Sequence, residues 1–252
     1  MLVAIGSIKG APGVTSTALA LAAAWPRPVA LVEADPSGGS VAYRCRAAGG
    51  GALAAAPSLL TLAAAVRGGV PYEGVLLEHA QTLGCGVNVV QGVTAAGQAR
   101  GLGSLWATIT HATQTAGADV VADLGRLDRT TPAFPVAAAA DVVVVIGAAA
   151  MDSVMHLRAG LRELTTALNA GRVATVLPVL VGPGAQAARD RADLDHMLMA
   201  IGLPVRPAGS IAYDPKGLER LEAGEDRRNR TALARSAREL VDHLMSQMGV
   251  PA

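Results

Sequence analysis

Short runs of apolar residues alternate along the chain with longer alanine-rich stretches, a pattern that predicts repeated strand–helix units. The short runs contain few polar positions, so we expect strands buried on both faces, as in a parallel sheet covered by helices. The predicted strands are Leu2–Gly6, Val29–Glu33, Val87–Gln91, Val120–Asp123, Val142–Gly147 and Ala174–Leu180. The predicted helices are Thr15–Ala24, Ser58–Arg67, Ala95–Ala116, Thr130–Ala139, Ser153–Ala170, Ala188–Ile201 and Thr231–Met248.

The order of these elements predicts an α/β fold with a mainly parallel, doubly wound sheet flanked by helices. No linker rich in proline, serine or charge divides the chain, so we expect a single domain over residues 1–252. The low-complexity segment Ala47–Pro57 reads as a flexible loop. Ligands of such sheets bind beyond the carboxyl ends of the strands, and the residues that follow each strand are therefore the candidates for a site.

Composition narrows the class of protein. Hydrophobic residues make up 51% of the chain and charged residues 16%, which excludes a disordered tail. Aromatic residues are only 2%, which argues against stacking on single-stranded nucleic acid, and the net charge of +1 supplies no global field toward DNA or an acidic membrane. Two cysteines in no CxxC pattern and a start without signal-peptide features favour a cytoplasmic protein.

A glycine-containing loop follows the first predicted strand and opens the first predicted helix. Gly10 and Gly13 allow backbone N–H groups to converge on an anion, which the amino end of the helix also attracts. Thr15 lies where a hydroxyl can both cap the helix and ligate Mg²⁺. An ordinary tight turn with a helix cap would use the same residue types, so the loop alone leaves both interpretations open.

This loop resembles the deviant Walker A motif (KGGxGK[ST][ST]) of the ParA/MinD family of P-loop ATPases. The matching positions are Lys9, Gly10, Gly13, Thr15 and Ser16. Further segments resemble the family in order, namely Val29–Pro36 as switch I, Asp119–Arg126 as Walker B and switch II, Asp141–Ala149 as the next strand, and Gly209–Gly224 as a late motif of MinD-like proteins. The resemblance covers nearly the whole chain, and its specificity lies in the order and spacing of these motifs.

The resemblance implies a site for ATP or ADP with Mg²⁺. It assigns nucleotide binding to Lys9, Gly10, Ala11, Pro12, Gly13, Val14, Thr15 and Ser16. It assigns the Mg²⁺ ion to Thr15 and Asp123, and the positioning of the attacking water to Asp35. Lys9 matches the signature lysine, which in the family reaches across a homodimer to the partner's phosphates, so Asp35 and Lys9 are the expected catalytic residues.

The implied function is the positioning of another assembly by a homodimer that is gated by nucleotide or is no longer gated. Asp123, Leu124 and Arg126 are similar to the DLPR sequence of the CpaE/TadZ branch, whose members place Tad-type pilus and secretion machines. Chromosome or cell-division assemblies are the other implied cargoes. The expected partners are therefore a second copy of the chain and proteins of such an assembly.

Three departures from the family motif predict a degenerate ATPase with weak or absent hydrolysis. Val14 replaces the lysine that reaches the β- and γ-phosphates, and an apolar side chain cannot replace an ammonium group. Pro12 has no N–H to offer to phosphate, and Ala11 replaces a glycine. After the sixth strand, Leu180–Gly184 replaces an Asn-Arg pair common on the adenine side of the family site.

Other functions remain as alternatives. A scaffold for protein partners that no longer uses nucleotide explains Val14 and Pro12, but not the retained acids. A dinucleotide-dependent oxidoreductase would use Glu33, although the glycine spacing is not GxGxxG. Acidic residues interleave with the arginines near the C-terminus, which weighs against direct DNA binding without excluding it. The apolar stripe of the last predicted helix favours core packing, with peripheral membrane contact as the alternative.

Overall fold

The computed structural model describes residues 1–169, 174–225 and 230–249. Its strands form one sheet in the order β3-β4-β2-β5-β1-β6-β7-β8, and every pairing is parallel except that of β3 with β4. The strands are β1 (Leu2–Ser7), β2 (Val29–Glu33), β3 (Gln81–Thr82), β4 (Asn88–Val90), β5 (Asp119–Arg126), β6 (Val142–Ala148), β7 (Thr175–Gly182) and β8 (Gly209–Ala212). The predicted mainly parallel, doubly wound sheet is confirmed.

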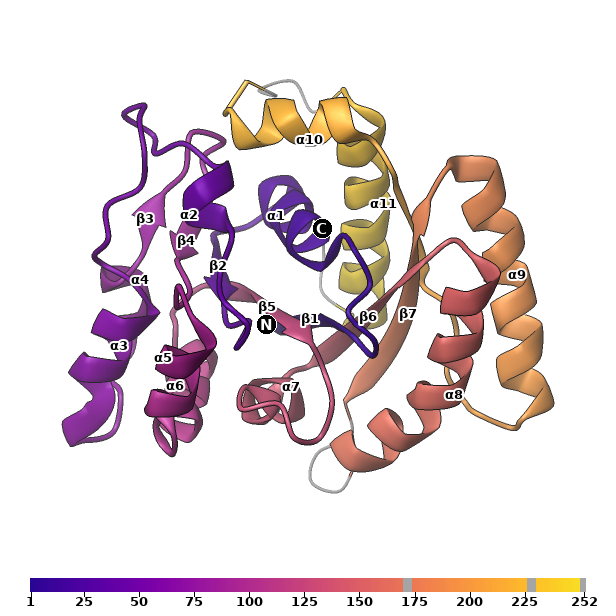
Figure 1. The fold of residues 1–252 in the computed structure, drawn as a ribbon, viewed down its shortest axis with the longest axis horizontal. Helices are drawn as coiled ribbons and strands as arrows, with labels where there is room; N and C mark the ends of the chain where they lie inside the picture. The colour runs from indigo at the N-terminus through magenta and orange to yellow at the C-terminus, as the bar shows by residue number, and fades with distance from the viewer. Residues whose placement is uncertain (170–173, 226–229, 250–252) are drawn as a thin grey trace.

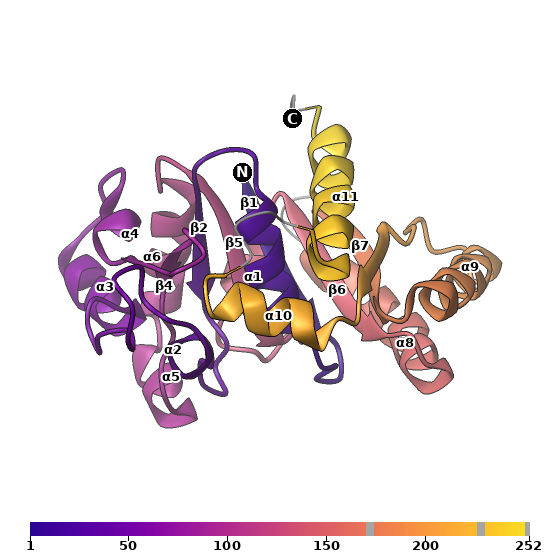
Figure 2. The ribbon, with the colours of Figure 1, turned by 90° about the horizontal axis from the view of Figure 1, so that it is seen from above.

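Helices cover both faces of the sheet (Figures 1 and 2). One face carries α1 (Val14–Ala24), α2 (Val41–Arg44), α10 (Pro215–Glu222) and α11 (Ala232–Gln247). The other carries α3 (Leu59–Ala65), α4 (Val75–Glu78), α5 (Ala96–Leu102), α6 (Leu105–Gln114), α7 (Phe134–Ala139), α8 (Met151–Leu168) and α9 (Gly184–Ala200), with a 3₁₀ turn over Val66–Gly68. In Figure 1, α1 and α10 lie above the sheet, and α7 and α8 lie below it.

Alternate residues of β1 serve the two faces, as the pleat of a strand requires. Val3 and Ile5 pack in the cluster with α1 and α11, while Leu2 and Ala4 pack in the cluster on the opposite face. All four side chains are buried, which explains why the strand reads as a continuous apolar run. β1 lies between β5 and β6, so the loop that follows it emerges where the strand order changes direction, at the place where such sheets bind ligands.

Several predicted boundaries are wrong. The helix predicted over Ala95–Ala116 is two helices, α5 and α6, because Gly103 adopts φ 47° between them. The helix predicted from Ala188 begins at Gly184, and the one predicted from Thr130 begins at Phe134. The short elements β3, β8, α2, α4 and α10 were not predicted. The predicted end at Ala170 lies outside the described residues.

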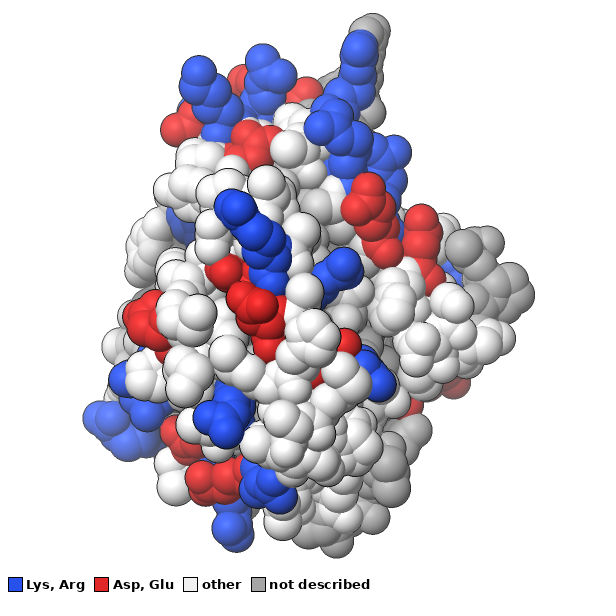
Figure 3. All heavy atoms as spheres, turned by 90° about the vertical axis from the view of Figure 1, so that its right-hand side faces the viewer, with Lys and Arg blue, Asp and Glu red and all other residues white. Residues whose placement is uncertain are grey.

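The described surface bears on two of the alternatives. No helix in the described ranges combines the length and the apolar character needed to cross a membrane. The apolar stripe of α11 is used internally, since Leu240, Leu244 and Met245 are buried in the cluster with α1. On the face shown in Figure 3, basic and acidic side chains are interspersed over the described surface, as the charge pattern near the C-terminus predicts.

Candidate functional site

The loop between β1 and α1 is built to present backbone N–H groups. Gly10 and Gly13 adopt φ 75° and 100°, a region that favours glycine, and Gly13 is the residue at which α1 begins. No side chain caps this end of the helix, so no side-chain acceptor satisfies its first-turn N–H groups. The loop therefore offers donors and a partial positive charge to an anion.

The structure shows the surroundings of the three loop residues that depart from the family motif, Ala11, Pro12 and Val14. Val14 is only 6% exposed and packs in the apolar cluster around α1, although it also borders the cavity beside the loop. The N–H of Ala11 donates to Ser7 Oγ at 2.9 Å, and Pro12 has no N–H. Two consecutive positions thus contribute no free donor, and the predicted loss of phosphate contacts at Ala11, Pro12 and Val14 has a structural basis.

Thr15, Asp35 and Asp123 lie on three different segments, but Thr15 and Asp35 border one cavity and Asp123 lies next to Thr15. Thr15 and Asp35 line this cavity, whose volume is about 260 Å³, together with Ser16 and Gly125. A Cβ added to Gly125 would lie 2.1 Å from Asp35 Oδ2, so the absence of a side chain there lets the carboxylate approach the backbone. We call this space the acid cavity.

Asp123 lies beside this cavity, next to Thr15. It is the fifth residue of β5 and is 1% exposed. Burial raises the pKa of Asp123 to about 6, and the charges of Glu33 and Asp35 act in the same direction, while hydrogen bonding from Thr15 and from the Gly125 N–H opposes the rise. The Gly125 N–H donates to Oδ1 at 3.0 Å, whereas Oδ2 is buried without a hydrogen-bond partner among the described residues.

An unpartnered buried carboxylate oxygen is costly unless a cation or donor completes it. Oxygen atoms of Asp123 and Thr15, with the cavity in front of them, are ligands of the kind that Mg²⁺ prefers. The residues present therefore fit the Mg²⁺ ion that the sequence resemblance implied.

Glu33 has a different role from the one that an oxidoreductase would need. Its carboxylate accepts hydrogen bonds from the N–H groups of Ser40 (2.5 Å), Val41 (2.9 Å) and Gly92 (2.9 Å). These contacts use both oxygens to hold the start of α2 and the end of β4. A carboxylate engaged in this way is not presented to a ribose, which argues against the oxidoreductase alternative.

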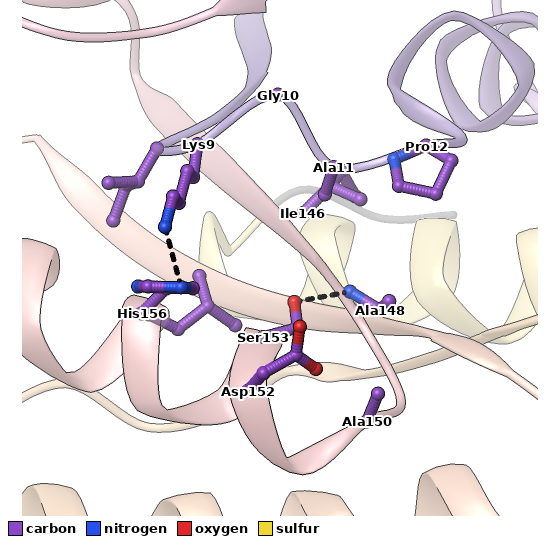
Figure 4. Close-up of a pocket in the computed structure, with 12 residues that line it drawn as sticks. Lys9, Gly10, Ala11, Pro12, Ile146, Ala148, Ala150, Asp152, Ser153 and His156 are labelled. Atoms are coloured by element: carbon purple, nitrogen blue, oxygen red, sulfur yellow. Dashed lines mark hydrogen bonds between the residues drawn. The ribbon is translucent and has the colours of Figure 1, made fainter.

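Lys9 lies in a separate cavity on the other side of the loop (Figure 4). This space, about 360 Å³ in volume, is bordered by Ile8, Asp152 and His156, and we call it the lysine cavity. Lys9 Nζ donates to His156 Nε2 at 2.8 Å, while Ser153 on the same helix accepts from the Ala148 N–H at 2.8 Å. The loop lysine therefore contacts α8 of its own chain rather than the acid cavity.

A third cavity adjoins the loop on its α10 side; the sequence analysis pointed to Leu180–Gly184, which includes part of its wall, but not to its residues from β8 and α10. Its volume is about 450 Å³, and its walls are mostly apolar. Gly13 and Ser16 border it from the loop, and Val181, Pro183 and Tyr213 border it from beyond β7 and β8. The rule that ligands bind beyond the carboxyl ends of strands would have found it, had β8 been recognised.

Two arginines also reach the acid cavity. Arg44 at the end of α2 and Arg126 at the end of β5 both line it. Sequence reasoning could not place either guanidinium, because each side chain approaches the loop only through tertiary packing.

Comparison of the sequence with protein-family models and with curated proteins finds no match. The fold, in contrast, matches solved structures along its whole length. An ATP complex of Cyanothece McdA aligns with a TM-score of 0.67 and 15% identity, covering 100% of this chain and 97% of that one. A ParA family ATPase of Chlorobium tepidum TLS aligns with a TM-score of 0.69 and 13% identity over 96% and 98% of the two chains.

The septum site-determining protein MinD of Pyrococcus horikoshii, complexed with Mg-ADP, aligns with a TM-score of 0.62 and 13% identity over 98% and 97% of the chains. These identities are low, and what the alignments share is the arrangement of strands and helices around the loop. The chain has a ParA/MinD-like fold of the P-loop ATPase type.

Proposed function

We propose that this protein binds an adenine nucleotide with Mg²⁺ at the β1–α1 loop and uses it to position another assembly. The observation that carries the proposal is the buried, unpartnered Oδ2 of Asp123 close to Thr15, at the uncapped amino end of α1. A scaffold with no ligand would leave this oxygen without compensation. The structural neighbours support the proposal, since they include complexes with ATP and with Mg-ADP.

Each residue has a defined task in this proposal. Thr15 and Asp123 hold the Mg²⁺ ion, which when bound neutralises phosphate charge. Asp35, fixed by the Ser37 N–H at 2.8 Å, orients a water molecule toward the phosphate. The 450 Å³ apolar cavity receives the base. Hydrolysis is slow or absent, because Val14 supplies no cation in the loop.

Positioning would require a dimer and protein partners. The neighbours again supply the support, since one is a septum site-determining protein and another is a MinC:MinD complex. Lys9 is exposed beside α8, and release from His156 would allow it to reach a second copy of the chain. A Lys9→Met variant should lose nucleotide-dependent dimerisation in sedimentation experiments, while monomeric wild-type protein with saturating MgATP would refute this role of Lys9.

Placement of a Tad-type pilus machine is the narrowest form of the proposal and rests on Asp123, Leu124 and Arg126 alone.

Calorimetric titration with ATP and ADP, each with and without Mg²⁺, tests nucleotide binding. We expect Mg²⁺-dependent binding that Thr15→Ala weakens about 10- to 100-fold, since one oxygen ligand of the ion is lost. Thr166→Ala, which removes an exposed threonine hydroxyl on α8, is the matched control and should bind as wild type does. Equal binding by Thr15→Ala and wild type would contradict the proposed Mg²⁺ site.

A nucleotide-independent scaffold is the second candidate. The burial of Val14 and the engagement of the Ala11 N–H by Ser7 favour it, because both remove groups that a phosphate would use. The same titration separates the candidates. No heat with millimolar nucleotide from a folded protein would establish the scaffold and overturn nucleotide binding.

A further inference from the structure

The acid cavity is well supplied with acceptors and poor in cations. Asp35 lines it and Asp123 lies next to Thr15 of its wall, yet the loop side chain at position 14 is a valine. A bound polyphosphate would bring further negative charge into this space. Binding therefore needs a cation besides Mg²⁺, and in the described part of the cavity wall the cationic side chains are Arg44 and Arg126.

Arg44 is attached to the loop itself. Its Nη2 donates to Ser16 Oγ at 2.9 Å, and the same nitrogen forms an ion pair with Glu222 at the end of α10. A guanidinium has five N–H donors, and both of these contacts use Nη2. The three donors on Nε and Nη1 have no partner within the described ranges, so single N–H donors remain for phosphate oxygens, while both fork-like edges of the guanidinium include the engaged Nη2.

Arg126 is placed less favourably. Its side chain is 64% exposed, and Nε lies 3.7 Å from Asp128 Oδ2 on the solvent side. The Arg44 side chain is 31% exposed, and a partly desolvated charge attracts an anion more strongly than a hydrated one.

The backbone that carries Arg44 is held by a buried acid. Glu33 accepts from the N–H groups of Ser40 and Val41 and so fixes the start of α2, whose last residue is Arg44. The Arg46 N–H donates to the Glu222 carbonyl at 3.3 Å, which ties the end of α2 to α10. The guanidinium is therefore presented from a segment anchored at both ends.

We propose that Arg44 supplies the phosphate-binding positive charge that Val14 does not, by donating its Nε and Nη1 N–H groups to the polyphosphate of a nucleotide in the acid cavity. This inference rests on the nucleotide binding proposed above. Glu222 remains on Nη2 and partly neutralises the guanidinium, so its negative charge opposes phosphate binding at Nε and Nη1 and couples α10 electrostatically to the nucleotide.

Titration calorimetry of the full chain with MgATP, MgADP and magnesium tripolyphosphate tests the assignment. Arg44→Met should weaken MgATP and tripolyphosphate binding about 10- to 100-fold, the range for losing charge-assisted hydrogen bonds. Arg46→Met is the matched control, because this exposed arginine lies two residues away and outside the cavity wall, and it should bind as wild type does. A preference for MgATP over tripolyphosphate shows that the base also contributes, while equal affinity overturns the nucleotide as the ligand.

Two further variants keep the test decisive if Arg44→Met does not fold by circular dichroism. Glu222→Gln frees Arg44 from its ion pair and should tighten MgATP binding several-fold, and Arg44→Lys should bind between wild type and Arg44→Met. The assignment to Arg44 is overturned if Arg44→Met binds MgATP as wild type does, or if Glu222→Gln leaves that affinity unchanged. Loss of binding in Arg126→Met would then assign the role to Arg126. Absence of binding by wild type and by Val14→Lys alike would instead overturn the proposed nucleotide function itself.

Discussion

The acid cavity and the lysine cavity both border the loop after β1 and differ in how far their polar groups are satisfied. Thr15 and Asp35 line the acid cavity next to Asp123, whose Oδ2 has no hydrogen-bond partner among the described residues. In the lysine cavity, Lys9 is satisfied by His156 of its own chain. The acid cavity therefore has an unsatisfied buried oxygen beside it, whereas the lysine of the other cavity has a partner within the chain.

The strongest way to break this comparison is to neutralise Asp123. Its folded pKa of about 6 lies above the ordinary aspartate value, so the folded protein holds a proton that the unfolded chain releases between about pH 4 and 6. Stability of the metal-free protein should consequently fall as pH rises through this window. At pH 7 the penalty is about 3 kcal/mol.

Asp123→Asn should therefore unfold at higher denaturant at pH 7 than wild type, with a flatter pH profile, and yet lose Mg²⁺-dependent nucleotide binding by about 100-fold or more. Asp242→Asn, at an exposed acid on α11 away from the cavity, is the control for both measurements. An Asp123→Asn protein that is less stable than wild type at pH 7 would show that the carboxylate is compensated within the chain.

Gly125 tests whether the acid cavity needs its close packing. Alanine there combines a φ of 60° with a Cβ 2.1 Å from Asp35 Oδ2, so we expect a loss of about 2–3 kcal/mol in the free energy of unfolding. Gly86→Ala is the matched control, because its φ of 89° is equally strained while no atom lies within 4 Å of the added Cβ. Denaturant titrations of both variants measure the difference, and equal losses would mean that Asp35 moves away at no cost.

Val14→Lys sharpens the comparison by restoring the missing cation. Because Val14 borders the acid cavity, a lysine there can extend its ammonium group into that space, and we expect nucleotide affinity to rise about tenfold. Its burial adds a cost of about 1–2 kcal/mol in unfolding experiments. Ala24→Lys adds the same charge at the far end of α1 and should leave affinity unchanged. An unchanged affinity in Val14→Lys would indicate that the site does not depend on loop charge.

The sequence was sufficient for the sheet because its central strands are short apolar runs that fit no other element. It also pointed to Thr15, Asp35 and Asp123, which lie in or after strands β1, β2 and β5, and the structure places Thr15 and Asp35 at one cavity with Asp123 next to Thr15. It could not supply Arg44, which reaches Ser16 only because Glu33 holds α2 in place. Nor could it show that Lys9 contacts His156, because the two residues are 147 positions apart and their contact depends on how α8 packs beside the loop.

Asp214 offers the test with the smallest expected effect. It caps α10, the helix whose Glu222 pairs with Arg44 of the acid cavity. Asp214 begins α10 and accepts from the Gly217 N–H at 2.9 Å, and this hydrogen bond, with others from Leu233 and Ala232, lowers the pKa of its carboxyl. A lowered folded pKa contributes stability above the unfolded value near pH 4, which is lost as pH falls through the folded value. Asp214→Ala should cost about 1 kcal/mol at pH 7 and much less below pH 3, measured by denaturant unfolding at both pH values. Asp242→Ala, on α11, is the control. Asp214 also lines the apolar cavity proposed for the base, so Asp214→Ala should in addition change MgATP affinity by a few-fold, whereas unchanged affinity would argue against a base in that cavity.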